Sequence, residues 1–179
     1  MIKLLVIPMK QFAKSLLVFG LVMAVSVNLL AQDRDYTYKA IFIYNFIKYI
    51  EWPASSQQFK IGILNGTPEV MAAFEKMIEK KSGEGHKLVL ENYHSASAVG
   101  DCQLLFIPDN QSTTLSAVSA KLSGKSTLIV TESDGLIKKG SGINFIVVDG
   151  KLRFELNRST LKDADLKVSS NLLGLAILV

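Results

Sequence analysis

The stretch KSTLIVTESDGLIKKGSGINFIVVDGKLRFELN, residues 125–157, carries the strongest local signals for the fold. Its first part, KSTLIVT (125–131), is a short apolar run that suits a strand buried on both faces. ESDGLIKKGSG (132–142) follows with three glycines and is typical of a loop. Asp149-Gly150 then predicts a type I′ turn between two strands. In the second strand, Leu152, Phe154 and Leu156 alternate with Lys151, Arg153 and Glu155. The stretch therefore predicts a buried strand followed by an antiparallel hairpin.

Upstream of this stretch, predicted strands alternate with predicted helices. FKIGIL (59–64) and CQLLFIP (102–108) are apolar runs that suit buried strands, and HKLVLENY (86–93) alternates as a strand does. PEVMAAFEKMIEKK (68–81) predicts a helix, with a capping threonine before it and proline at its first position. STTLSAVSAKL (112–122) predicts a weaker helix. This order indicates a mostly parallel sheet that is covered by helices on both faces.

The predicted fold class is therefore α/β, with the parallel sheet ending in the antiparallel hairpin and a C-terminal helix. The tail from Ser159 is predicted to be helical, with one side formed by Val168, Leu172, Leu175 and Ala176. A chain of 179 residues without internal repeats or linkers suits a single domain.

An aromatic segment, AIFIYNFIKYIEWP (40–53), precedes these elements, and seven of the 15 aromatic residues lie between Tyr36 and Trp52. Lys39 and the two charges inside the segment make it a poor bilayer span. Its apolar spacing instead predicts a helix packed on the sheet through Ala40, Ile43, Tyr44, Ile47 and Ile50. Three aromatic residues of the segment remain: Phe42, Phe46 and Tyr49. Either a second side of the helix is also covered and these residues are buried, or they face a partner, and the sequence leaves both possibilities open.

Residues 1–31 resemble a secretory signal peptide. Three lysines precede SLLVFGLVMAVSVNLLA (15–31), which has no charge and ends in a small residue. We expect cleavage after Ala31, which leaves an exported domain of residues 32–179 with no membrane insertion. The alternative is an uncleaved N-terminal anchor, which a 17-residue apolar run only just permits.

The charge balance argues against nucleic acid as a partner. The leader holds three of the 20 basic residues and no acidic one, so residues 32–179 carry 17 basic and 16 acidic side chains. Nucleic-acid binding needs a clustered basic face, which a nearly neutral domain does not predict. The single cysteine, Cys102, excludes an internal disulfide and suits a small buried hydrophobic residue.

The sequence predicts no catalytic, cofactor or metal site. His86 and His94 stand near the two ends of one predicted strand, roughly 26 Å apart, which is too far to share a metal ion. The nucleophile elbow and the glycine-rich nucleotide motifs are absent, so we do not expect an enzyme. Ser133 and Asp134 are candidate ligand-binding residues because open sheets bind ligands at the carboxyl ends of their strands. Asp134-Gly135 suits a turn equally well.

Four stretches together resemble the YfiR-like family of exported bacterial proteins. They are KAIFIYNFIKYIEWP (39–53), LIVTESDG (128–135), INFIVVDGKLRFELN (143–157) and LKVSSNLLGLA (166–176). The resemblance implies a periplasmic α/β protein that forms a homodimer and acts by binding the periplasmic region of a membrane-bound diguanylate cyclase or sensor kinase. Better-known members carry paired cysteines linked to redox control, which the lone Cys102 does not permit.

The same resemblance implies which residues face a partner: Tyr49, Trp52, Phe154, Glu155, Asn157, Ser169, Ser170 and Leu173. Several of these residues also suit a role inside the domain, since the aromatic residues suit a core, Asn157 suits a helix N-cap and Ser169-Ser170 suits a helix start. The predicted function is a periplasmic regulatory binding protein that restrains a membrane-bound signalling protein. The alternative is a periplasmic small-molecule-binding sensor domain that uses Ser133 and Asp134.

Overall fold

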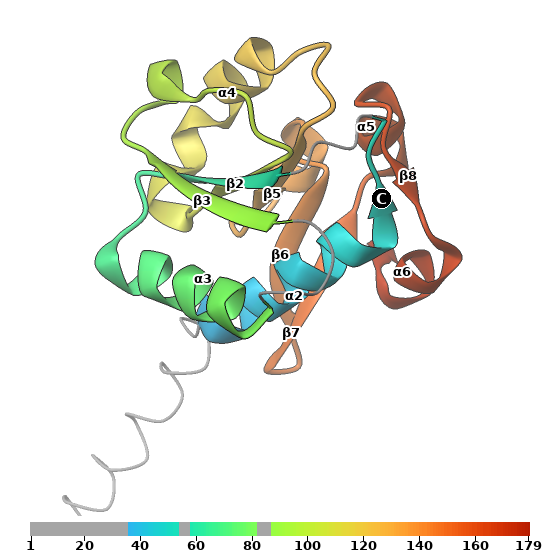
Figure 1. Ribbon diagram of the computed structural model, residues 1–179. Coiled ribbons are helices and arrows are strands. Elements are labelled where there is room, and N and C mark those ends of the chain that lie inside the picture. The colour runs from blue at the N-terminus through green and yellow to red at the C-terminus, as the bar shows by residue number, and fades with distance from the viewer. Residues whose placement is uncertain (1–35, 54–57, 82–86) are drawn as a thin grey trace, which may run out of the picture. The chain divides into compact units, whose positions relative to one another are not determined.

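The computed structural model describes residues 36–53, 58–81 and 87–179 (Figure 1). The predicted signal peptide, its cleavage site and His86 lie outside these residues. Within them, a seven-stranded sheet has the strand order β3-β2-β4-β5-β6-β7-β9. The strands are β2 (Gln58–Leu64), β3 (Lys87–Tyr93), β4 (Leu104–Ile107), β5 (Leu128–Thr131), β6 (Ile143–Val148), β7 (Lys151–Leu156) and β9 (Ile177–Leu178).

Strands β3, β2, β4, β5 and β6 run parallel, and β7 pairs antiparallel with β6. The short β9 then pairs parallel with β7 at the edge of the sheet. Asp149 and Gly150 join β6 to β7 with positive φ angles of 52° and 69°, as a type I′ turn requires. The predicted α/β class, its mostly parallel sheet and its hairpin are thus confirmed.

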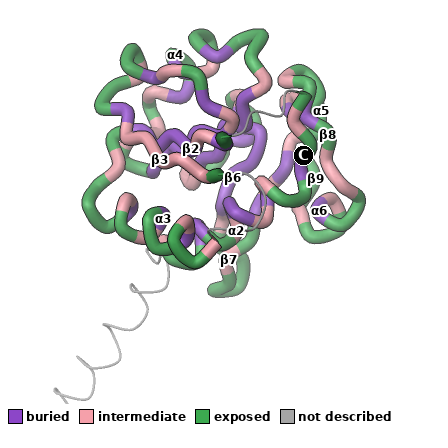
Figure 2. The backbone as a smooth tube through the Cα atoms, viewed as in Figure 1, coloured by how far each residue is buried: buried purple, intermediate pink, exposed green. Residues whose placement is uncertain are grey.

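Helices cover both faces of the sheet (Figure 1). One face packs against α2 (Tyr36–Tyr49), α3 (Pro68–Lys81) and α6 (Ser170–Leu175), and the other against α4 (Leu115–Lys121) with three 3₁₀ turns. The turns are η1 (Ala96–Ala98), η2 (Asp109–Thr114) and η3 (Leu136–Lys139). Alternate residues of β4 enter two separate hydrophobic clusters, which explains why the central strands are apolar without interruption. Figure 2 shows the buried residues along these strands and the exposed ones on the outer sides of the helices.

The aromatic residues of α2 answer the question that the sequence left open. Phe46 has no exposed surface, and its ring centroid lies 5.8 Å from that of Phe145 and 5.0 Å from that of Phe154. Phe42 lies 6.0 Å from the same two rings. Phe46 therefore belongs to the core and the partly buried Phe42 packs against it, whereas Tyr49 is 37% exposed.

The predicted C-terminal helix is confirmed as α6, and Ser169 is its N-cap, but the tail from Ser159 is not helical throughout. The tail forms α5 (Arg158–Asp163), β8 (Lys167–Val168), α6 and β9 instead. Asp165 ends the first helical segment with a left-handed φ of 56°, and Ser169 caps a new helix by accepting a hydrogen bond from the Leu172 amide at 3.3 Å. Leu172 is buried as predicted, but Leu175 is 62% exposed.

Candidate functional site

A two-stranded ribbon joins the end of α2 to the tail of the chain. Strand β1 (Ile50–Glu51) pairs antiparallel with β8, and the Ser169 amide donates to the Tyr49 carbonyl at 3.0 Å. This pairing brings together predicted partner-binding residues that are about 120 positions apart in the sequence. We call the surface around the ribbon the strand-pair surface and define it by Tyr49, Glu51, Lys167, Ser170 and Leu173.

The strand-pair surface is held in place by backbone and capping contacts. Ser169 is the N-cap of α6, so its hydroxyl and its amide are both used inside the chain. Ser170, the next residue, is exposed. Leu173 is half-buried and packs against the main core. Ser169 therefore positions this surface, while Tyr49 and Ser170 present side chains on it.

Trp52 lies just beyond β1 and is half-buried. Its indole Nε1 donates to the Gln103 carbonyl at 3.1 Å, and its ring meets Phe59 edge-on with centroids 4.8 Å apart. These contacts fix the indole against the β2–β4 part of the sheet. The sequence placed Trp52 among the partner-facing residues; in the structure its polar end is bonded internally.

Three other predicted partner-binding residues have roles inside the domain. Phe154 is 2% exposed and packs beneath α2, so its ring is a core residue and not part of a contact surface. Glu155 is half-buried and accepts a hydrogen bond from Asn144 Nδ2 at 3.0 Å. Asn157 caps α5, accepting from the Thr160 amide at 3.1 Å. The capping interpretation of Asn157 is confirmed.

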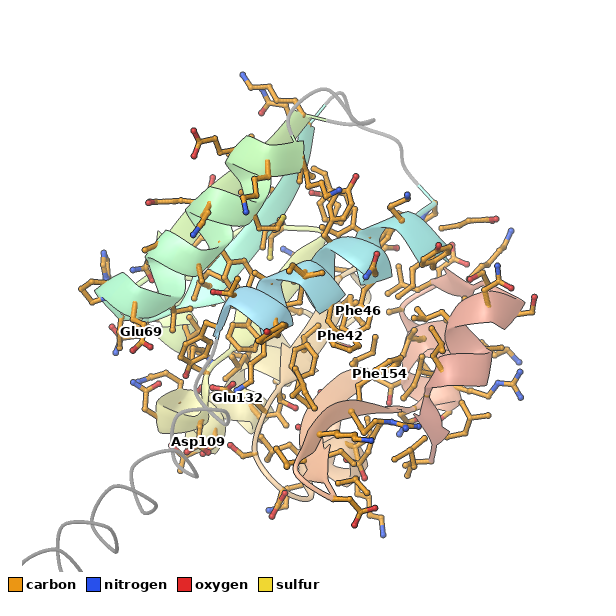
Figure 3. All side chains as sticks on the ribbon, turned by 90° about the horizontal axis from the view of Figure 1, so that it is seen from below. Phe42, Phe46, Glu69, Asp109, Glu132 and Phe154 are labelled. Atoms are coloured by element: carbon orange, nitrogen blue, oxygen red, sulfur yellow. The ribbon has the colours of Figure 1, made fainter. Side chains whose placement is uncertain are left out.

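The carboxyl ends of β4 and β5 hold a second cluster, at the position where open sheets bind ligands (Figure 3). Glu132 accepts hydrogen bonds from the Tyr36 hydroxyl at 3.0 Å, from Lys39 Nζ at 2.6 Å and from the Asp109 amide at 2.8 Å. The side chains of Lys39 and Glu132 are only 8% and 3% exposed. We call Tyr36, Lys39, Asp109 and Glu132 the strand-end anchor, because they tie the first turn of α2 to the sheet.

Burial and the Glu132 carboxylate both raise the pKa of Tyr36. The phenol therefore stays protonated and keeps donating to Glu132 over the whole physiological range. Sequence reasoning missed the pairing of Lys39 with Glu132, which are 93 residues apart. The available signal was a lysine on the otherwise apolar inner side of α2.

Ser133 and Asp134, the predicted ligand-binding residues, follow Glu132 directly. The Ser133 hydroxyl donates to Asp109 Oδ1, and Asp134 is exposed beside Gly135, whose φ is 76°. The turn interpretation of Asp134-Gly135 is thus confirmed. The donors and acceptors around Glu132 bond to one another, which makes this end of the sheet an internal anchor.

Cys102 and His94 offer little to catalysis. Cys102 is buried as predicted, and burial raises the pKa of its thiol to about 12. His94 is exposed at the end of β3. In the described ranges, no three His, Cys, Asp or Glu side chains gather where they could hold a metal ion. No helix of the same ranges is long and apolar enough to cross a bilayer.

The fold defines the class: an α/β domain in which the end of α2 and the tail of the chain meet in a two-stranded ribbon. The chain belongs to the YfiR/HmsC-like family, whose model matches residues 36–177. This membership confirms the resemblance that the sequence indicated.

A solved structure of a conserved domain protein from Vibrio cholerae O1 biovar El Tor has a similar fold, with a TM-score of 0.55 at 10% sequence identity. The similarity covers 80% of this chain and 59% of that one, so the chain spans less than two thirds of that protein's length. No curated protein sequence matches the chain.

Proposed function

We propose that this chain is a periplasmic regulatory binding protein that restrains a membrane-bound signalling protein, of the diguanylate cyclase or sensor kinase type, by direct contact. The family match supports the regulatory class. The contact face that we propose is the strand-pair surface together with the apolar residues that follow it in the tail.

The observation that carries this proposal is the exposure of large apolar side chains next to the strand-pair surface. Tyr49 is 37% exposed at the end of α2. Helix α6 leads into an exposed segment that we call the apolar tail: Leu175 (62%), Ile177 (37%), Leu178 (48%) and Val179 (47%). Contiguous exposed apolar residues of this kind mark interaction sites, with tyrosine a frequent anchor.

Restraint by contact has a thermodynamic requirement. The regulator lowers the output of its partner only if it binds the inactive conformation more tightly than the active one. A tenfold preference corresponds to about 1.4 kcal/mol. Two or three apolar side chains buried in one partner conformation and exposed in the other supply that difference, since each contributes roughly 1.5–3 kcal/mol on full burial.

The test uses cells that lack the gene and carry plasmid-borne variants. Deletion is expected to raise the output of a membrane sensor, read as intracellular cyclic di-GMP, and the wild-type gene is expected to restore it. A photo-crosslinking residue at Tyr49 is expected to capture an inner-membrane protein. The matched control at Ser116, exposed on α4, is expected to capture none.

The substitution Leu175→Ser is expected to fail to restore the low output, because it removes apolar contact area without touching the core. Unchanged cyclic di-GMP on deletion, together with no membrane protein captured from Tyr49, would overturn the proposal for cyclases. Capture of a sensor kinase with unchanged cyclic di-GMP would assign the second partner type.

Two further parts of the proposal concern export and assembly. We propose that the leader is removed after Ala31, so that the periplasmic protein begins at Gln32, and that the protein forms a homodimer. N-terminal sequencing of protein from the periplasmic fraction tests the first part. Sedimentation equilibrium tests the second, and a mass of one chain at micromolar concentration would contradict it.

A further inference from the structure

Strand β3 forms one outer edge of the seven-stranded sheet (Figure 1). It has seven residues, KLVLENY, and no strand in the described part of the chain pairs with its outer side. An unpaired strand edge readily accepts another strand, so proteins usually shorten such edges or interrupt them with proline or a bulge. β3 pairs with β2 in one unbroken register and contains no proline, whereas β9, at the other edge of the sheet, has only two residues. We call residues 87–91 of this strand the β3 edge.

The backbone groups of β3 alternate in direction. The Tyr93 carbonyl accepts a hydrogen bond at 2.7 Å from the amide of Asn65, the residue that follows β2 directly. The amide and carbonyl of one strand residue point to the same side, and those of the next residue point to the opposite side. The amides and carbonyls of Leu88 and Leu90 therefore point away from β2, where a further strand can bond to them.

The sequence of the β3 edge, KLVLE, is complementary to itself in the antiparallel direction. A reversed copy places Val89 opposite Val89, each Leu88 opposite a Leu90, and each Lys87 opposite a Glu91. In this register the leucine pairs exchange backbone hydrogen bonds, and the lysine–glutamate pairs occupy the positions where opposite side chains lie closest. A shift of two residues places Lys87 or Glu91 opposite Val89 and loses both opposite-charge pairs.

The side of the β3 edge that faces α3 is apolar. Leu88 and Leu90 are partly buried there and pack against the main core. Pairing with a second copy brings each of these leucines beside a leucine of the other copy. The apolar surface that the core already forms is then continued across the pair.

The opposite side of the β3 edge carries its charges. Lys87 is exposed, and the side chain of Glu91 is 37% exposed. Glu91 is held in place by Lys60 Nζ at 2.9 Å and by the Tyr93 hydroxyl at 2.6 Å. Because Lys60 already pairs with Glu91, a contact with Lys87 of a second copy selects the register, and the backbone bonds and the leucine pairs supply most of the attraction.

We propose that two copies of this chain pair antiparallel through the β3 edge, about a two-fold axis at Val89, and so join their sheets into one. A two-fold interface requires a surface that matches itself, and the β3 edge matches itself in its backbone bonds and in its side chains. This inference rests on the homodimer of the proposed function and names its interface. No residue of the strand-pair surface belongs to the β3 edge, so the two contacts are tested separately.

The test is sedimentation equilibrium of the purified protein with substitutions at the axis residue. Val89→Lys and Val89→Glu each bring two like charges together, and each is expected to raise the dissociation constant of the dimer at least about tenfold. An equal mixture of the two variants places opposite charges at the axis, and is expected to dimerise within about threefold of the wild type. Native mass spectrometry, with one variant isotope-labelled, is expected to show mainly mixed dimers.

Lys87→Glu is a second variant, and it changes an exposed side chain. It places two carboxylates opposite each other at both ends of the β3 edge, and is expected to weaken the dimer about tenfold. The control Lys151→Glu makes the same change of charge at an exposed position on β7, and is expected to stay within about twofold of the wild type. Urea unfolding followed by Trp52 fluorescence checks that each variant folds.

The outcomes separate this interface from the rest of the proposed function. A wild-type dimer that Val89→Lys, Val89→Glu and Lys87→Glu all leave unchanged would overturn the β3 edge and keep the homodimer. Single variants that dissociate, with a mixture that does not restore the dimer, would overturn the two-fold pairing. A wild type that is a monomer would contradict the homodimer together with this interface, whereas failure to capture a membrane protein from Tyr49 would contradict the regulatory contact alone.

Discussion

The strand-end anchor makes a quantitative prediction about Glu132→Gln. Three donors converge on this carboxylate: the Tyr36 hydroxyl, Lys39 Nζ and the Asp109 amide. Glutamine keeps the shape but offers one acceptor oxygen and an amino group, so at least one donor then faces another donor. The substitution also removes the negative charge opposite a lysine whose side chain is 8% exposed.

The size of the effect follows from the geometry. At the Lys39–Glu132 separation of 2.6 Å the gross attraction is about 6 kcal/mol for an effective dielectric constant of 20. Most of this attraction is offset by the cost of removing both charges from water. When Glu132 is replaced, Lys39 remains buried, so the cost of removing its charge from water remains but the attraction is lost. We therefore expect Glu132→Gln to lower the free energy of unfolding by about 3–5 kcal/mol. That is a large part of the roughly 5–15 kcal/mol of a typical domain.

Urea unfolding measures this change through the fluorescence of Trp52, the only tryptophan, which packs on Phe59 in the folded state. Lys39→Met and the double variant complete a thermodynamic cycle, and the double variant is expected to cost less than the sum of the two single ones by at least about 1.5 kcal/mol. Lys48→Met, exposed on the same helix, is the control and is expected to stay within about 0.5 kcal/mol of the wild type.

Two results would refute this reasoning. If Glu132→Gln cost no more than Lys48→Met, the carboxylate would not anchor α2. If the coupling energy between Lys39 and Glu132 stayed below about 0.5 kcal/mol, the pair would not act as a unit, and the loss would belong to the Tyr36 and Asp109 hydrogen bonds.

Three further predictions concern the core and the caps. Burial raises the pKa of the Cys102 thiol to about 12, whereas the pKa of a thiol in the unfolded chain is about 8.5. The buried thiol therefore stabilises the fold fully below about pH 8.5, and this stabilisation is lost as the pH rises from there towards 12. Cys102→Ala should reduce this alkaline loss of stability in urea titrations, and an equal loss in both proteins would contradict the role of Cys102. Gly62→Ala should destabilise by about 1–3 kcal/mol, because the new Cβ would lie 2.6 Å from the Tyr93 ring, whereas Gly174→Ala, in open space on α6, should stabilise by about 0.5–1 kcal/mol. Asn157→Ala should cost about 1 kcal/mol in thermal unfolding through the loss of the α5 cap, and Asn157→Ser should restore most of it.

The elements that the sequence predicted well are those fixed by interactions within a few residues. Helix α3 runs from Pro68 to Lys81 as predicted, because Thr67 caps it and proline suits its first turn. The hairpin turn at Asp149-Gly150 is equally local. The tail was predictable only in part: the helix start at Ser169 is a local cap that the sequence indicated, whereas the short strand β8 before it depends on pairing with β1.

The candidate site likewise has features that local sequence patterns predict and features that only the tertiary structure shows. An alternating pattern shows that Phe154 shares a side with Leu152 and Leu156, but not that α2 covers that side of the hairpin. Only the folded chain places Phe42 and Phe46 against Phe154. The strand-end anchor could not be predicted for a related reason. No local sequence pattern links Lys39, near the start of the domain, to a glutamate 93 residues later.

The two clusters act on opposite ends of one helix. Helix α2 has 14 residues, about 21 Å of length. The strand-end anchor fixes its first turn to the sheet through Glu132, and the β1–β8 ribbon fixes its last residue through the bond from the Ser169 amide to the Tyr49 carbonyl. A helix held at both ends and packed along its inner side presents Tyr49 at a fixed position, so binding there requires little ordering of the backbone.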